Sequence, residues 1–99
     1  MSYRVIQWAT GGVGRAAIAG ILAHPELELV GCWVSSEEKA GRDIGDICGL
    51  PPVGIQATCD VESLLATEAD CVLYSPMMAD RQLVARLLAS GKNVVTPLG

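Results

Sequence analysis

The stretch "QWATGGVGRAA", residues 7–17, decides the fold, because it joins a strand pattern to a helix pattern through a glycine-rich turn. Residues 3–8 (YRVIQW) are a short apolar and β-branched run, which predicts a buried strand. From residue 13 to about residue 23, apolar and small side chains recur at intervals of three and four, which predicts a helix that ends before Pro25. A strand, a turn and a helix in this order begin a βαβ unit.

The same alternation of strands and helices continues along the chain. Further strands are predicted at 27–34, 53–56, 69–75 and 92–96, with one short helix from its cap Asp60 to Ala66 and another between its cap Asp80 and Gly91. The polar segment 35–46 predicts a loop with one or two helical turns. This order is typical of an α/β domain with a doubly wound, mostly parallel sheet of Rossmann type, with strand order 3-2-1-4-5. Because such sheets usually continue, we expect residues 1–99 to be one N-terminal domain of a longer chain.

Composition excludes several classes of protein. With 99 residues, 51% of them hydrophobic, the chain can build one core but not two. A net charge of −4 without a basic tail argues against nucleic acid as a partner. No run approaches the ~20 apolar residues of a membrane span, so we expect a cytoplasmic protein that does not bind membranes. The four cysteines form no C-x-x-C pair, which predicts reduced, buried thiols and no metal site.

The turn is the first candidate site, and its members are Ala9, Thr10, Gly11, Gly12, Val13 and Gly14. Gly11 lets the backbone approach a pyrophosphate, Gly14 lets the helix pack closely on the strand, and the exposed amides after Gly11 attract an anion. Ala9 stands where the usual fingerprint has its first glycine, so we expect Ala9 to keep a negative φ. The alternative is a tight turn without a ligand.

The loop after the second strand indicates which dinucleotide binds. Sites specific for NAD place an acidic residue there to bind the ribose hydroxyls, whereas this chain has Ser35. Ser36, Lys39 and Arg42 add a hydroxyl and two cations, a set suited to a 2′-phosphate, so NADP is favoured and NAD stays possible. Against this, Glu37 or its neighbour Glu38 could reach the ribose, or the loop could be a solvated stretch of mixed charge.

The last candidates follow the fourth and fifth predicted strands, whose carboxyl ends lie at the edge where open α/β sheets bind ligands. Ser75, Pro76, Thr96 and Pro97 could form walls for the nicotinamide half of the cofactor, whereas the methionines at 77 and 78 fit helix packing equally well. No carboxylate pair, Ser/His/Asp set or activated cysteine is visible, so the catalytic residues are expected beyond Gly99.

Four segments together, "YRVIQWATGGVGRAAIAGIL", "ELVGCWVSSEEKAGRDIGDICG", "ADCVLYSP" and "GKNVVTPLG", resemble the N-terminal domain of the dihydrodipicolinate reductase-like superfamily. Within it, the pattern S-x-x-K-x-G-R-D-x-G at 36–45 resembles the branch of 2,4-diaminopentanoate dehydrogenase and related amine dehydrogenases. The resemblance implies reversible hydride transfer between NAD(P)H and a carbon–nitrogen centre, with the cofactor over residues 9–14. It also implies a small amine or imine substrate bound by a further domain, and we expect a homo-oligomer.

Two other functions use the same turn. A dinucleotide-binding sensor or regulatory module would bind the cofactor without doing chemistry. A domain that binds CoA or a methyl donor is the third hypothesis, but methyl-donor sites commonly need an acidic residue where Ser35 stands.

Overall fold

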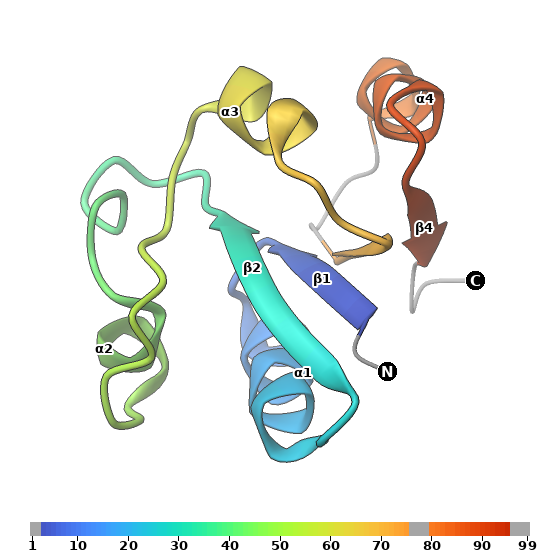
Figure 1. The fold of residues 1–99 in the computed structure, drawn as a ribbon. Helices are drawn as coiled ribbons and strands as arrows, with labels where there is room; N and C mark the ends of the chain where they lie inside the picture. The colour runs from blue at the N-terminus through green and yellow to red at the C-terminus, as the bar shows by residue number, and fades with distance from the viewer. Residues whose placement is uncertain (1–2, 76–79, 96–99) are drawn as a thin grey trace.

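Each strand is followed by one or two helices along the chain, up to the last strand, in the computed structural model, which describes residues 3–75 and 80–95 (Figure 1). In chain order the elements are β1 (Tyr3–Trp8), α1 (Gly12–Ala23), β2 (Leu27–Trp33), α2 (Ile44–Cys48), α3 (Val61–Ala66), β3 (Cys71–Tyr74), α4 (Arg81–Ala89) and β4 (Asn93–Val95). None of the helices within these residues is both long and apolar enough to cross a membrane.

The four strands form one parallel sheet in the order β2-β1-β3-β4, which confirms the α/β class. Trp8 at the end of β1 lies opposite Trp33 of β2 and Tyr74 of β3, so these three strands end in one row. The rings of Trp8 and Trp33 stack with centroids 5.3 Å apart and planes 7° from parallel. The carboxyl ends of the strands therefore share one edge, where the glycine turn also lies.

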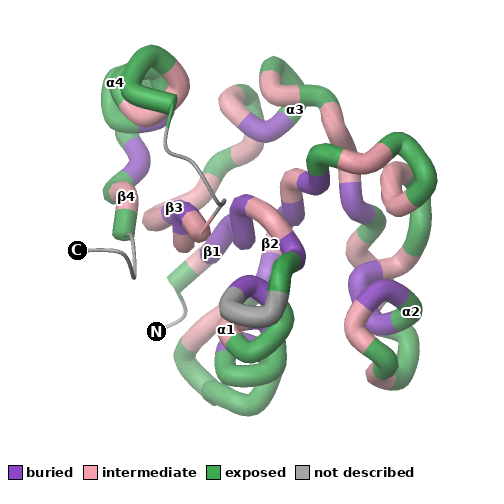
Figure 2. Tube along the Cα trace, turned by 180° about the vertical axis from the view of Figure 1, so that it is seen from behind, coloured by how far each residue is buried: buried purple, intermediate pink, exposed green. Residues whose placement is uncertain are grey.

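The core has two halves because strand side chains alternate between the two faces of the sheet. Val5 packs in a cluster with α1 and α2, whereas Ile6 packs in a second cluster with α3 and α4. Figures 1 and 2 show these two pairs of helices on opposite sides of the sheet. On α1, the predicted apolar face is the buried one, since Ile18 and Ile21 are almost wholly inaccessible to water.

The helix ends follow the predicted caps. Asp60 accepts hydrogen bonds from the amides of the first turn of α3, and Asp80 does the same for α4. Gly91, just after α4, adopts the left-handed conformation expected of a helix stop, with φ +91°. α1 ends at Ala23, as predicted from His24 and the following proline.

The predicted strand at 53–56 is wrong, and with it the five-strand order. Only Thr58 bridges to the edge of the sheet, beside Trp33. Asp43 explains the difference, because its carboxylate accepts from the amides of Val53 (2.9 Å) and Gly54 (2.7 Å) and leaves them unavailable for a ladder. These bonds, together with one from the amide of residue 45, hold the pKa of the Asp43 carboxyl below its usual range.

Candidate functional site

Ala9 has φ +83°, so the expectation of a negative φ at this position is wrong. The turn must reverse the chain within a few residues after β1, and Ala9, at the position of the fingerprint's first glycine, takes a left-handed conformation. The Ala9 amide donates to the carbonyl of Trp33 at 2.8 Å, and the Ala9 carbonyl accepts from the Gln7 side chain at 3.0 Å. The tertiary fold thus imposes a conformation that costs a non-glycine residue roughly 1–2 kcal/mol.

The N-terminus of α1 lacks the side-chain cap that the other described helices have. Asp43, Asp60 and Asp80 cap α2, α3 and α4, whereas the N-cap of α1 is Gly11 and no acidic residue stands in its first turn. A Cβ built on Gly11 would meet nothing within 4 Å, so the turn is open on that side. The first amides of α1, those of Gly12 and its neighbours, are therefore suited to an anionic ligand.

Position 14 requires glycine because the backbone of Ala9 lies very close to it. A Cβ at this position would lie 2.3 Å from the carbonyl oxygen of Ala9, which is shorter than any ordinary contact. Gly14 was expected to let the helix pack on the strand, and the structure adds that the nearest obstacle is the turn's own carbonyl. The first turn of α1 and the residue after β1 thus fit together only without a side chain here.

Two cations converge on Thr10, which is 5% exposed. Lys39 Nζ reaches from the loop after β2 to the Thr10 hydroxyl at 3.3 Å. Arg15 Nε donates to the Thr10 carbonyl, also at 3.3 Å. Lys39 was predicted as a site residue, but Arg15 was missed, although its place directly after Gly14 in the first turn of α1 was a usable signal.

Within the part of the chain that the structure describes, the other predicted site residues of the loop after β2, Ser35, Ser36 and Arg42, do not contact the glycine turn as Lys39 does. Ser35 is exposed, and the Ser36 hydroxyl accepts from the amide of Glu38 at 3.3 Å. Arg42 forms an ion pair with Asp46, with Nη2 and Oδ2 2.7 Å apart. The structure therefore brings Lys39 to the turn but holds Arg42 on the first turn of α2, and a role for Arg42 in cofactor binding stays a prediction.

Ser75, directly after β3, forms hydrogen bonds with the end of β1. Its hydroxyl donates to the Trp8 carbonyl at 3.2 Å and accepts from Gln7 Nε2 at 2.8 Å. The predicted residues Pro76, Thr96 and Pro97, with the methionines at 77 and 78, lie outside the described residues. The sequence did not single out Gln7, because a buried glutamine in a strand has no pattern of its own.

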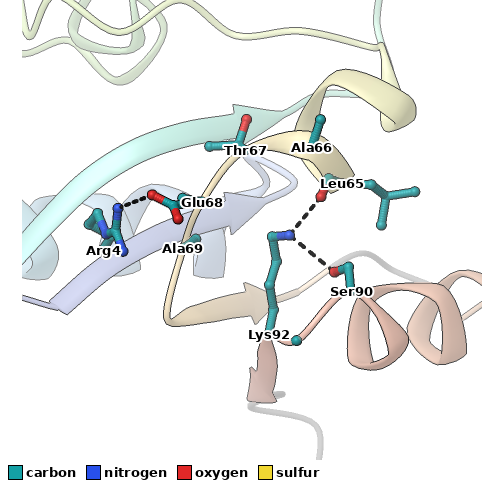
Figure 3. A pocket seen from close by; sticks show the side chains of 9 residues that line it. Arg4, Leu65, Ala66, Thr67, Glu68, Ala69, Ser90 and Lys92 are labelled. Carbon is teal, nitrogen blue, oxygen red and sulfur yellow. Dashed lines mark hydrogen bonds and ion pairs between the residues drawn. The ribbon is translucent and has the colours of Figure 1, made fainter.

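Two pockets among the described residues lie away from this site. Figure 3 shows one of about 270 Å³ at the opposite, amino ends of the strands, where Arg4 pairs with Glu68. There the buried Lys92 donates to the Leu65 carbonyl at 2.8 Å and so completes the end of α3. The other, about 500 Å³, is lined by apolar residues of α1 and of the segment 50–53. Neither pocket contains a predicted site residue.

The chain is similar to several known proteins. It is 38% identical over 98 residues to an amine dehydrogenase of Streptomyces virginiae, a match that covers 93% of this chain and 27% of that protein. It is 41% identical over 61 residues to a 4-hydroxy-tetrahydrodipicolinate reductase of Synechococcus elongatus, covering 62% of this chain and 22% of that protein. The chain therefore spans about a quarter of the length of these curated relatives.

Among solved structures, that of an amine dehydrogenase from Mycobacterium smegmatis matches 97% of this chain and 30% of its own, with a TM-score of 0.81 and 28% identity. The family described as "Dihydrodipicolinate reductase, N-terminus" matches residues 5–97. These matches confirm the resemblance that the sequence motifs indicated. Because that family covers nearly the whole chain, the chain belongs to the family of the dihydrodipicolinate reductase N-terminal domain.

Proposed function

We propose that this chain is the NADP-binding domain of an oxidoreductase that acts at a carbon–nitrogen centre. The observation that carries the choice of NADP is the convergence of Lys39 and Arg15 on Thr10, beside the uncapped end of α1. The amides of α1 suit the pyrophosphate, and the two cations suit a 2′-phosphate, since guanidinium and ammonium groups bind phosphate through charge-assisted hydrogen bonds. Ser35 supports the same choice, because it presents no carboxylate to repel a phosphate.

The electrostatics of this corner agree with an anionic ligand. The half-buried thiol of Cys48 lies close enough to Arg15 and Lys39 for both charges to act on it: burial raises its pKa, and the two cations oppose that rise. Both cations also keep free donors, because each makes only one hydrogen bond within the described residues.

The reaction class is proposed from the names of the relatives. One is an amine dehydrogenase and the other a reductase of 4-hydroxy-tetrahydrodipicolinate, and this chain itself belongs to the family of the dihydrodipicolinate reductase N-terminal domain. The cofactor would supply or accept hydride at its nicotinamide ring, and this chain's part is to bind and orient it. Substrate contacts and acid–base groups are proposed to lie outside these residues, and the four free thiols are consistent with a cytoplasmic protein.

The cofactor proposal is tested by titrating NADPH and NADH into the intact protein by calorimetry. NADPH should bind more tightly, and Lys39→Met should weaken NADPH about tenfold, the loss of one charge-assisted bond, while changing NADH less than about twofold. Arg86→Met is the matched control, since Arg86 is an exposed cation that pairs with Glu62 and lies on α4, which packs in the other core cluster from α1. Tighter binding of NADH, or an equal loss of both cofactors in Lys39→Met, would refute the NADP proposal.

The reaction proposal is tested separately, by following NADPH absorbance with a panel of ketones plus ammonia, and NADP+ reduction with the matching amines. Turnover in both directions supports an amine or imine oxidoreductase. Tight binding of NADPH without turnover on any member of the panel would instead support the sensor or regulatory alternative.

A further inference from the structure

Gln7 is a wholly buried polar residue in the middle of an apolar strand. It is 0% exposed, and its neighbours in β1, Ile6 and Trp8, are equally buried hydrophobic residues. An amide removed from water is unfavourable unless hydrogen bonds replace its lost hydration. A valine or leucine would satisfy the packing at this position, so packing alone does not require an amide.

The Gln7 amide binds the two chain segments that flank the candidate site. Nε2 donates to the carbonyl of Ala9 at 3.0 Å and to the Ser75 hydroxyl at 2.8 Å, with the Trp8 carbonyl 3.4 Å away. The Ser75 hydroxyl donates in turn to the Trp8 carbonyl at 3.2 Å. One side chain thus connects the turn after β1 with the end of β3.

The direction of the amide is determined by its surroundings. Two carbonyl oxygens, those of Ala9 and Trp8, face Nε2, and a reversed amide would set Oε1 against both of them. In the observed direction Oε1 has no partner within the described residues. Gln7 therefore leaves one buried acceptor unpaired while it binds the Ala9 carbonyl.

The Ala9 carbonyl lies between Gln7 and the start of α1. A Cβ on Gly14 would be 2.3 Å from that oxygen and 3.2 Å from Gln7 Nε2, so the three groups are in close contact. Ala9 has φ +83°, a conformation that alanine leaves readily when nothing holds it. A return to negative φ would swing the carbonyl away from Gln7 and turn the peptide plane that leads into α1.

We propose that Gln7 is a positioning residue for the dinucleotide site: its amide holds the Ala9 carbonyl so that the turn keeps its positive φ and aims the first amides of α1 at the pyrophosphate. Through Ser75 the same amide holds the end of β3 at the same edge. Gln7 touches no ligand itself and acts through Ala9. This inference rests on the proposed function, because it assumes a dinucleotide in the turn.

The test is a double-mutant cycle on the intact protein, with the Kd for NADPH measured by calorimetry. Gln7→Met keeps the length of the side chain and removes the amide, and it should weaken binding about tenfold, the worth of one or two hydrogen bonds. In the Ala9→Gly background the same substitution should weaken binding less than about threefold, because glycine adopts positive φ without being held. Ile6→Val is the control, since it trims the neighbouring buried strand residue without touching the turn.

Gln7→Glu provides a second readout that packing alone does not produce. A protonated carboxyl can donate to the Ala9 carbonyl, whereas an ionised one repels it, so NADPH binding by Gln7→Glu should tighten as the pH falls, relative to the unaltered protein at each pH. This variant also keeps the inference testable if Gln7→Met does not fold.

The outcomes distinguish the positioning role of Gln7 from the proposed binding of a dinucleotide. If Gln7→Met binds NADPH as the unaltered protein does, or loses equal affinity in both Ala9 backgrounds, Gln7 is only a packing residue and the inference is overturned. A pH dependence of Gln7→Glu that matches the unaltered protein overturns it too. If the unaltered protein binds neither NADPH nor NADH, the proposed function itself fails, and the inference fails with it.

Discussion

Replacing Ala9 by glycine should stabilise the protein, although alanine-to-glycine changes usually destabilise. Ala9 has φ +83°, and glycine would remove a conformational cost of about 1–2 kcal/mol. Against this, glycine loses more backbone freedom on folding, which costs about 0.5–1 kcal/mol. The net gain should be about 0.75 kcal/mol, within the range of roughly 0–1.5 kcal/mol that these two costs leave, because no side-chain packing beyond one methyl group is lost.

The assay is urea unfolding of the intact protein, in which Ala9→Gly should raise the midpoint and leave the slope m unchanged. Ala85→Gly is the matched control. It makes the same chemical change at an exposed position in the middle of α4, where φ is helical. The control should lose about 1 kcal/mol. If Ala9→Gly is destabilised as much as Ala85→Gly, Ala9 does not hold a strained conformation and the account of the turn is refuted.

Three further predictions follow from close contacts and shifted pKa values. Gly14→Ala should destabilise the protein by about 1–3 kcal/mol and weaken NADPH binding, since its Cβ would lie 2.3 Å from the Ala9 carbonyl; chemical unfolding and calorimetry measure the two effects. The pKa of Asp43 is lowered in the fold, so its stabilising effect is complete above the ordinary aspartate pKa, about 3.9, and is lost as pH falls below that value through the lower folded pKa. Asp43→Asn should therefore lower Tm at neutral pH and reduce the difference in Tm between neutral and acidic pH; an unchanged acid profile contradicts this. Burial raises the pKa of Cys32 to about 12, so Cys32 should resist iodoacetamide at neutral pH in the native protein and react after unfolding, as peptide mass spectrometry can measure.

Local features of the sequence predicted much of the fold. The run of residues 3–8, the glycine turn and the periodic apolar face of the next helix were enough to place β1 and α1. Asp60 and Asp80 predicted the starts of two more helices, because a capping carboxylate acts on amides within its own first turn. These predictions succeed because each depends on interactions between residues close together in the chain.

Only the tertiary structure decided the details of the candidate site. Ala9, at positive φ, donates to the carbonyl of Trp33 in β2, and the contact of Lys39 with Thr10 joins residues 29 positions apart. The missing third strand depends on Asp43, whose carboxylate binds amides ten and eleven residues further on. The sequence determined that a glycine turn joins β1 to α1 at the carboxyl edge of the sheet. Which groups hold that turn depends on long-range hydrogen bonds, which leave no periodic pattern in the sequence.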